Sequence, residues 1–224
     1  MARLGATASR PWRSSATIKL THYLPDRAKR EHGTLTVIST AGSIENVSRL
    51  ANARGGCVEK FALVQGGTPV PADARLELLG RLPDLESLLL LGKTGHVFNT
   101  FGDLRGKSIG IGPEGSGTAY LMRQLFEDPD LRALDVYLSH HGLLEQAQLV
   151  AESKLDLAAF VMQEDAEFLR TVIRQHGLDI ASPQDLQGLI APTHGSVLVV
   201  SQPVATTWCA QSPQWTNKLR VSEH

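Results

Sequence analysis

The sequence has little of what marks a membrane-spanning or nucleic-acid-binding protein. Its longest apolar stretch, Leu157-Ala-Ala-Phe-Val-Met162, has the length of a strand, whereas a transmembrane helix needs about eighteen consecutive apolar residues. The formal net charge is −1, so no general attraction to nucleic acid or to a membrane surface is expected. These absences argue against a membrane-spanning chain and against a nucleic-acid partner.

Residues suited to metal binding are also few. Cys57 and Cys209 are the only cysteines, and neither has the spacing of a metal site. They could form a disulfide in an oxidising compartment, which the sequence leaves open. His140-His141 ends an expected strand, where adjacent side chains point to opposite faces. We therefore interpret these histidines as loop and surface residues, and predict no metal and no cofactor.

The two ends of the chain lack clear periodicity. Residues 1–32 are rich in lysine and arginine and have no apolar segment of the kind that follows the basic start of a secretory signal. We expect a basic, irregular leader there, with a basic partner-binding arm as the alternative. Residues 201–224 are expected to form a tail.

Between these ends, strand and helix patterns alternate, which predicts an α/β protein with parallel-type sheets flanked by helices. In such sheets, ligands bind at the carboxyl ends of the strands. Residues 33–101 are assigned to a first lobe, and residues 102–200 to a second lobe with a return segment. The expected strands are 34–39, 61–64, 87–91, 109–111, 135–138, 155–160, 178–180 and 195–200, and the expected helices are 44–53, 74–82, 118–127, 143–153 and 165–176.

The segment Gly110-Ile-Gly-Pro-Glu-Gly-Ser-Gly-Thr118 lies between an expected strand and an expected helix. Unpaired N–H groups and the positive end of the helix dipole favour an anion at such a place. No Gly-Lys-[Ser/Thr] follows, so it is not a Walker loop, and the acidic residue of a dinucleotide fingerprint is not clear. The alternative is a tight turn in which Ser116 or Thr118 caps the helix.

Three segments together resemble the TAXI family of TRAP-transporter solute receptors. They are Ser39-Thr-Ala-Gly-Ser-Ile-Glu-Asn46, Phe61-Ala-Leu-Val-Gln-Gly-Gly67 and the segment from Asp103 to Thr118. Leu155-Asp-Leu-Ala-Ala-Phe160 and Leu189-Ile-Ala-Pro-Thr193 agree with later parts of that family. The resemblance covers about residues 33–200.

The resemblance implies a two-lobed type II periplasmic-binding-protein fold that closes on a small carboxylate or amino acid and presents it to a TRAP membrane permease. It also implies a periplasmic location, although a cytoplasmic one stays open because no signal peptide is visible. Elements that should complete the first lobe are not recognisable, so that lobe is expected to be incomplete. The ligand-binding residues carried over by motif are Gly42, Ser43, Gln65, Gly66, Gly67, Gly115, Ser116, Gly117 and Thr118.

Three other functions stay open at this point. A truncated copy would be a non-binding or interaction protein, because an unfilled lobe exposes apolar surface. A hydrolase would use Ser116, but Glu114 occupies the first glycine of the nucleophile-elbow pattern. An effector-sensing domain would normally follow a helix-turn-helix, for which residues 1–33 are too short and irregular. The arginines that could pair a carboxylate are Arg49, Arg105 and Arg123.

Overall fold

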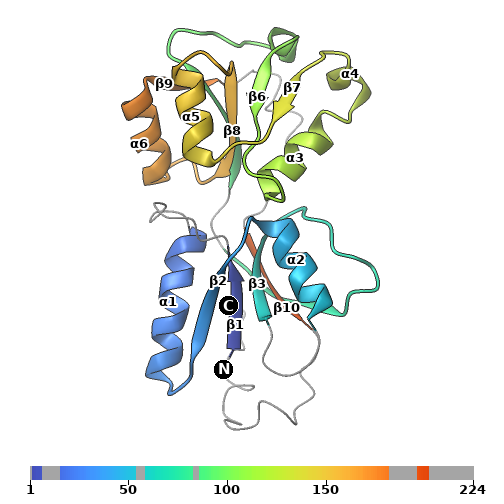
Figure 1. Ribbon diagram of the computed structural model, residues 1–224, viewed down its shortest axis with the longest axis vertical. Coiled ribbons are helices and arrows are strands. Elements are labelled where there is room, and N and C mark those ends of the chain that lie inside the picture. Colours follow the sequence, from blue (N-terminus) through green and yellow to red (C-terminus); the bar gives the residue numbers. More distant parts are fainter. Residues whose placement is uncertain (1, 7–15, 54–58, 83–85, 182–195, 202–224) are drawn as a thin grey trace.

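The chain folds into two α/β lobes stacked along the long axis of the molecule (Figure 1). The computed structural model describes residues 2–6, 16–53, 59–82, 86–181 and 196–201. Each lobe is built on a five-stranded sheet flanked by helices. The chain passes from the first lobe to the second between β4 and β5, and returns between β9 and β10.

The first sheet has the strand order β2-β1-β3-β10-β4. Strand β1 pairs in parallel with β2 and β3, while β10 is antiparallel to both of its neighbours. Helix α2 packs on β3 through a small core of Val47, Leu50, Ala62 and Val64. The elements of this lobe are β1 (Ala2–Ala6), α1 (Ala16–Arg30), β2 (Leu35–Ser39), α2 (Ser43–Asn52), β3 (Glu59–Gln65), β4 (Leu76–Arg81) and β10 (Ser196–Ser201).

The second sheet has the order β7-β6-β8-β5-β9, in which β5 is antiparallel to both neighbours. The chain crosses into the second lobe at β5 and returns to the first lobe at β10. Because each of these strands is antiparallel to its neighbours, both sheets are mixed rather than purely parallel. The elements are β5 (Ser87–Lys93), the 3₁₀ helix η1 (Phe101–Leu104), β6 (Ser108–Gly110), α3 (Gly117–Leu125), α4 (Pro129–Arg132), β7 (Tyr137–Ser139), α5 (Leu143–Ala151), β8 (Leu157–Met162), α6 (Glu167–His176) and β9 (Leu178–Ala181).

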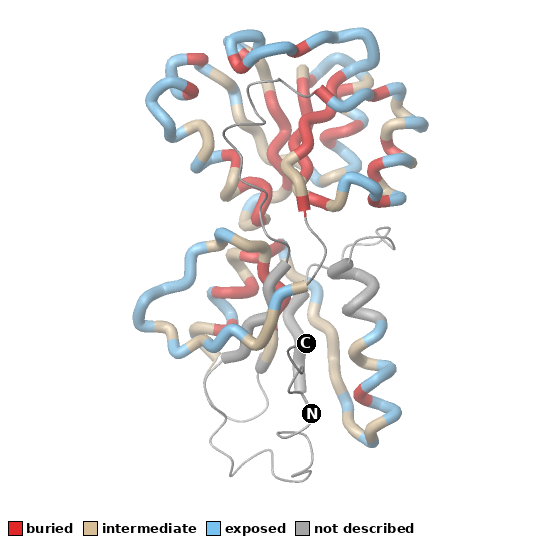
Figure 2. Tube along the Cα trace, turned by 180° about the vertical axis from the view of Figure 1, so that it is seen from behind, coloured by how far each residue is buried: buried red, intermediate tan, exposed pale blue. Residues whose placement is uncertain are grey.

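The central strands of the second lobe are buried on both faces. Successive side chains of a strand point to opposite sides, and Leu90 belongs to the same core as Met122 of α3, whereas Leu91 belongs to the same core as Val150 of α5. In the same way, Ala159 and Phe160 of β8 belong to different cores. Continuous apolar runs, rather than alternating ones, are what strands covered by helices on both faces require. The buried residues accordingly gather along these strands (Figure 2).

Three expectations about the elements are wrong. Residues 1–32 are not an irregular leader, because β1 lies between β2 and β3 and α1 occupies Ala16–Arg30. The expected helix at 74–82 is the strand β4, whose pairing with β10 outweighs the helix propensity of its leucines and glutamate. Strand β5 belongs to the second sheet, so the second lobe begins before residue 102. The tail at 201–224 and both cysteines lie outside the described residues, apart from Ser201 in β10.

Asp156, the residue before β8, forms hydrogen bonds with Ser108 of β6. Its carboxylate accepts hydrogen bonds from the N–H and Oγ of Ser108, at 2.9 and 2.8 Å, and lies 3.2 Å from Nζ of Lys107. Partial burial opposes ionisation, but the bonds from Ser108 and then Lys107 outweigh it, so the pKa of Asp156 lies below its usual range. A carboxyl group with a depressed pKa stabilises the fold above its unfolded-state pKa, and this contribution is lost as the pH falls through the folded-state pKa.

We therefore expect Asp156→Asn to lower the free energy of unfolding by about 1 kcal/mol at pH 7, a modest value because the side chain is partly in water. The difference from the wild type should shrink as the pH falls below about 4. Urea unfolding at pH 7 and pH 3 measures both values. Asp73→Asn, at an exposed loop position, is the control that should change little. A loss of the same size at both pH values would contradict this role of the charge.

Candidate functional site

The carboxyl ends of β2 and β3 in the first lobe face the second lobe, and those of β6 and β7 face the first (Figure 1). The segments that follow these ends are 40–43, 65–67, 112–118 and 139–141. They include every residue that the sequence predicted to bind a ligand. We call the place where Ala41–Ile44 and Gln65 meet Gly115–Gly117 the interlobe seam.

Hydrogen bonds within the first lobe hold its side of the seam. Ser43 is the first residue of α2, and its Oγ accepts the N–H of Gln65 at 3.0 Å. Asn46 is 2% exposed and donates from Nδ2 to the carbonyl of Leu63 at 2.8 Å. Its Oδ1 accepts the hydroxyl of Thr40 at 2.7 Å. Together these bonds tie the start of α2 to the ends of β2 and β3.

A carboxylate supports the turn before α2. Glu45 accepts the N–H of Ala41 at 2.7 Å and pairs with Arg49 at 3.1 Å. The bond from Ala41, followed by that from Arg49, lowers the pKa of Glu45 below its usual range. Glu45 is therefore ionised near neutral pH, and its charge lies in the first turn of the helix, where negative charge is stabilising.

On the second-lobe side, Ser116 is the N-cap of α3, and its hydroxyl accepts the N–H of Ala119 at 3.1 Å. Thr118 is buried in the first turn of the same helix. The start of the loop is held by Gln146, which is fully buried and whose Oε1 accepts the N–H of Gly112 at 2.8 Å. Nε2 of Gln146 donates to the carbonyl of Ala159 at 2.8 Å. The loop is thus fixed to α5 and β8.

The two lobes touch directly at the seam. The N–H of Ile44, near the start of α2, donates to the carbonyl of Gly115 at 3.1 Å. A Cβ built on Gly42 would lie 2.6 Å from Cα of Ser116, and one built on Gly117 would lie 2.2 Å from Oε1 of Gln65. The contact at Gly42 is with backbone, so glycine is required for this close approach, whereas an added Cβ at Gly117 would force the side chain of Gln65 to move.

The structure thus brings most of the predicted residues to one place. Those that meet at the seam are Gly42, Ser43, Gln65, Gly115, Ser116 and Gly117. Gly66 and Gly67 form the turn after β3, where Gly67 is exposed, and Thr118 lies behind Ser116 in α3. Their roles toward a ligand stay a prediction.

Two histidines that were interpreted as loop and surface residues lie in the loop after β7, but their side chains are half-buried. His140 is half-buried and its Nδ1 lies 3.1 Å from the carbonyl of Gly112, so Nδ1 carries the proton. Its Nε2 contacts Nη2 of Arg123. His141 is also half-buried, with Nε2 3.0 Å from Oγ of Ser139. Their place after β7, next to the loop 112–118, was the signal that could have identified them.

The candidate arginines are engaged with protein groups. Arg49 pairs with Glu45, Arg105 donates to the carbonyl of Ala133 at 2.8 Å, and Arg123 contacts His140. Within the described ranges, no group of three or more His, Cys, Asp or Glu residues could hold a metal ion. In the same part of the chain, no helix is both long and apolar enough to cross a membrane.

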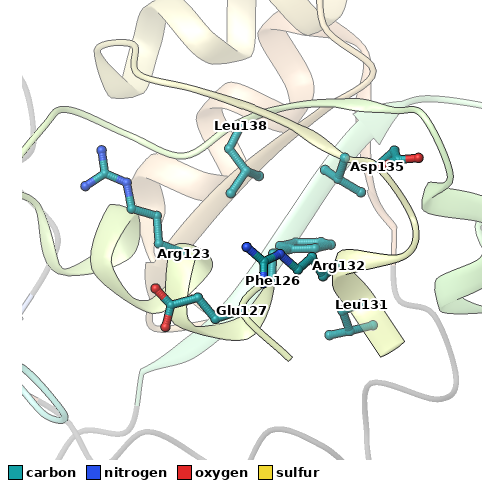
Figure 3. A pocket seen from close by; sticks show the side chains of 8 residues that line it. Arg123, Phe126, Glu127, Leu131, Arg132, Asp135 and Leu138 are labelled. Atoms are coloured by element: carbon teal, nitrogen blue, oxygen red, sulfur yellow. The ribbon is translucent and has the colours of Figure 1, made fainter. Parts of the chain in front are cut away.

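The second lobe has a concave region, which we call the outer groove (Figure 3). This outer groove has a volume of about 630 Å³ and lies between α3, α4 and β7. Both apolar and charged side chains line it. They are Arg123, Phe126, Glu127, Leu131, Arg132, Asp135, Val136 and Leu138.

We expect Gln146→Leu to destabilise the protein by roughly 2–4 kcal/mol, because it leaves the buried N–H of Gly112 and carbonyl of Ala159 without partners. Gln148→Leu is the matched control: Gln148 lies on the exposed side of the same helix and bonds only Glu152 among the contacts described, so its loss should cost less than about 0.5 kcal/mol. Urea unfolding of both variants measures the difference. Equal losses would show that the buried amide does not hold the loop.

The fold matches those of solved binding proteins and a sensing domain. An ancestral arginine-binding protein bound to arginine matches with a TM-score of 0.62 at 14% identity, covering 90% of this chain and 84% of that chain. The alkanesulfonate-binding protein SsuA from Xanthomonas axonopodis pv. citri, bound to MOPS, matches with 0.63 at 15% identity, covering 93% and 68%. The effector-binding domain of QuiR in complex with shikimate matches with 0.61 at 11% identity, covering 90% and 88%. At these identities the likeness concerns the fold, which is that of two-lobed periplasmic binding proteins.

Among curated proteins, none matches this sequence. A family model, in contrast, matches residues 19–187, which include α2, β3, the loop 112–118 and all of the second sheet. The chain belongs to the NMT1-like family.

Proposed function

We propose that the chain is a solute-binding protein that takes a small carboxylate or amino acid between its lobes. The observation that carries this proposal is the convergence of two helix starts from different lobes, α2 and α3, at one seam. Helix N-termini present N–H donors and a positive potential, which favour a carboxylate. Glu114 is exposed beside Gly115, so an ammonium group of an amino acid would find an acidic partner at the same edge.

The transport role is part of this proposal. The segments that resemble TAXI receptors coincide with both sides of the seam, which favours a TRAP membrane permease as the partner and a periplasmic location. Proteins with the same fold include the arginine-binding and alkanesulfonate-binding proteins, whose ligands carry a carboxylate or a sulfonate group. The QuiR effector domain shares the fold as well, so an effector-sensing role is the alternative with the same binding chemistry.

A thermal-shift screen tests the binding proposal, with L-amino acids, succinate and ethanesulfonate as probes. A ligand at 100 times its Kd stabilises the folded state by about 2.7 kcal/mol, which for a chain of this size corresponds to a rise in Tm of roughly 5–10 °C. We expect one probe to give a saturable rise, and Ser116→Ala and Thr118→Ala to reduce that rise. Ser48→Ala, on the exposed face of α2, should keep it.

The readout is the ligand-dependent shift and not the Tm of the variant alone, because Ser116→Ala also removes a helix cap. A sharp unfolding transition that no probe moves would contradict the binding proposal and favour the non-binding interaction protein.

One observation favours hydrolysis as a second candidate. Nε2 of His141 lies 3.0 Å from Oγ of Ser139, and Nδ1 lies 3.5 Å from a carboxylate oxygen of Glu145. A histidine placed between a serine hydroxyl and a carboxylate is the connectivity of a catalytic triad. However, 3.5 Å is long for the orienting hydrogen bond, and the other oxygen of Glu145 already accepts the N–H of Gly142 at 3.1 Å.

Hydrolysis of p-nitrophenyl acetate separates the two candidates. We expect the wild type to show the same slow rate as Ser139→Ala, because the arrangement lacks a well-oriented histidine. Ser116→Ala is the control, since that hydroxyl caps α3 and has no histidine among its described contacts. A wild-type rate at least tenfold above that of Ser139→Ala, with Ser116→Ala unaffected, would contradict the receptor proposal and favour an esterase.

A further inference from the structure

The start of α2 finds its hydrogen-bond partner in the other lobe. The first N–H groups of a helix have no acceptor within their own helix. Here the N–H of Ile44, in the first turn of α2, donates to the carbonyl of Gly115 at 3.1 Å. The carbonyl oxygen therefore occupies the kind of position that a carboxylate oxygen takes at a helix N-terminus.

The two lobes approach each other closely around this bond. Gly42 approaches the backbone of Ser116, and its φ of 154° is one that side chains rarely adopt. Gly117 receives the side chain of Gln65, whose Cβ, Cδ and Oε1 lie within 3.0 Å of the position of an added Cβ. Gln65 is itself fixed to the first lobe, because Ser43 accepts its N–H at 3.0 Å. The backbones of the two lobes thus meet at Gly42, and the side chain of Gln65 lies against Gly117.

We propose that the interlobe seam is a latch that holds the lobes together through the protein's own backbone, and that an anionic ligand must displace the carbonyl of Gly115 to reach α2. Gly42 and Gly117 make the latch possible because their missing side chains let the lobes approach. The displacement of the carbonyl by a ligand rests on the proposed function. The holding together of the lobes does not.

A latch of this kind regulates affinity. For a ligand that requires the unlatched arrangement, the apparent Kd equals the intrinsic Kd divided by the fraction of molecules in that arrangement. If one molecule in ten is unlatched, the apparent Kd is tenfold higher than the intrinsic value. The direct contact between the lobes would then lower the apparent affinity for every solute, so that only a solute with a high intrinsic affinity binds.

Amide hydrogen exchange of Ile44, followed by NMR in buffer without added solute, tests the latch. We expect the wild-type amide to exchange at least tenfold more slowly than in an unfolded chain, and Gly42→Ala to remove most of that protection. The matched control is Gly95→Ala, because Gly95 also has a positive φ, 89°, but an added Cβ there meets nothing within 4 Å. It should leave the exchange of Ile44 unchanged.

A single and a double variant on the other side of the seam show whether the effect of Gly42→Ala is only a local folding defect. Gly117→Ala places a methyl group against Gln65, and we expect it to speed the exchange of Ile44. Adding Gln65→Ala removes Cδ and Oε1, which lie 2.7 and 2.2 Å from the added Cβ, but keeps Cβ at 3.0 Å, so it should restore part of the protection. The amides of Ala62 in the core of the first lobe and Ala159 in a core of the second report in each variant that both lobes are folded.

The outcomes distinguish this inference from the proposed function. An Ile44 amide that exchanges at the unfolded-chain rate in the wild type overturns the latch, whatever the thermal-shift screen shows. Protection that persists in both Gly42→Ala and Gly117→Ala also overturns it. A protected Ile44 that responds to these variants, together with no thermal shift from any probe, supports the latch and contradicts the binding function.

Discussion

The bond between the N–H of Ile44 and the carbonyl of Gly115 connects the two lobes through their backbones. It joins the start of a helix in one lobe to the loop before a helix in the other. The elements around it are oriented by buried amides, Asn46 in the first lobe and Gln146 in the second, each of which bonds two backbone or side-chain groups of neighbouring segments. Lobes that touch at such a seam are suited to opening and closing as bodies.

The same contact connects the fold to the proposed function. A helix start that attracts a carbonyl oxygen also attracts a carboxylate, because both present a partial or full negative charge to the same N–H groups. The site therefore needs no metal and no catalytic group to act as a receptor. Specificity would come from the two ends of a small ligand, with the anion at the helix starts and a cationic group near Glu114. The outer groove, with its two arginines and two acids, lacks any such convergence of helix starts.

Much of this site could be predicted from the sequence, because it depends on local rules. Gly-rich and hydroxyl-rich segments after apolar strands indicated the strand ends at 40–43, 65–67 and 112–118, and the structure places them together. The contact between Ile44 and Gly115 could not be predicted, since it joins residues distant in the chain whose meeting depends on how the lobes pack. The same holds for Gln146, which looks like an ordinary polar residue of a helix until β6 and β8 surround it.

The errors have a similar origin. Strand β1 has small residues and no β-branched run, so its place in the sheet follows from its pairing with β2 and β3 and not from its own propensity. Strand β4 contains good helix formers, and only the long-range pairing with β10 makes it extended. His140 and His141 were judged by the alternation of a strand, but they lie beyond the end of β7, where the chain turns toward the loop 112–118.

The measurement that tests the central claim most directly is an NMR titration of the ¹⁵N-labelled chain with L-amino acids and succinate. If the seam is the binding site, saturable changes in chemical shift should appear at the amides of Ile44, Gly115 and Gly117 with at least one of these solutes. Changes confined to Phe126 and Leu138 of the outer groove, or no saturable change with any solute, would contradict it.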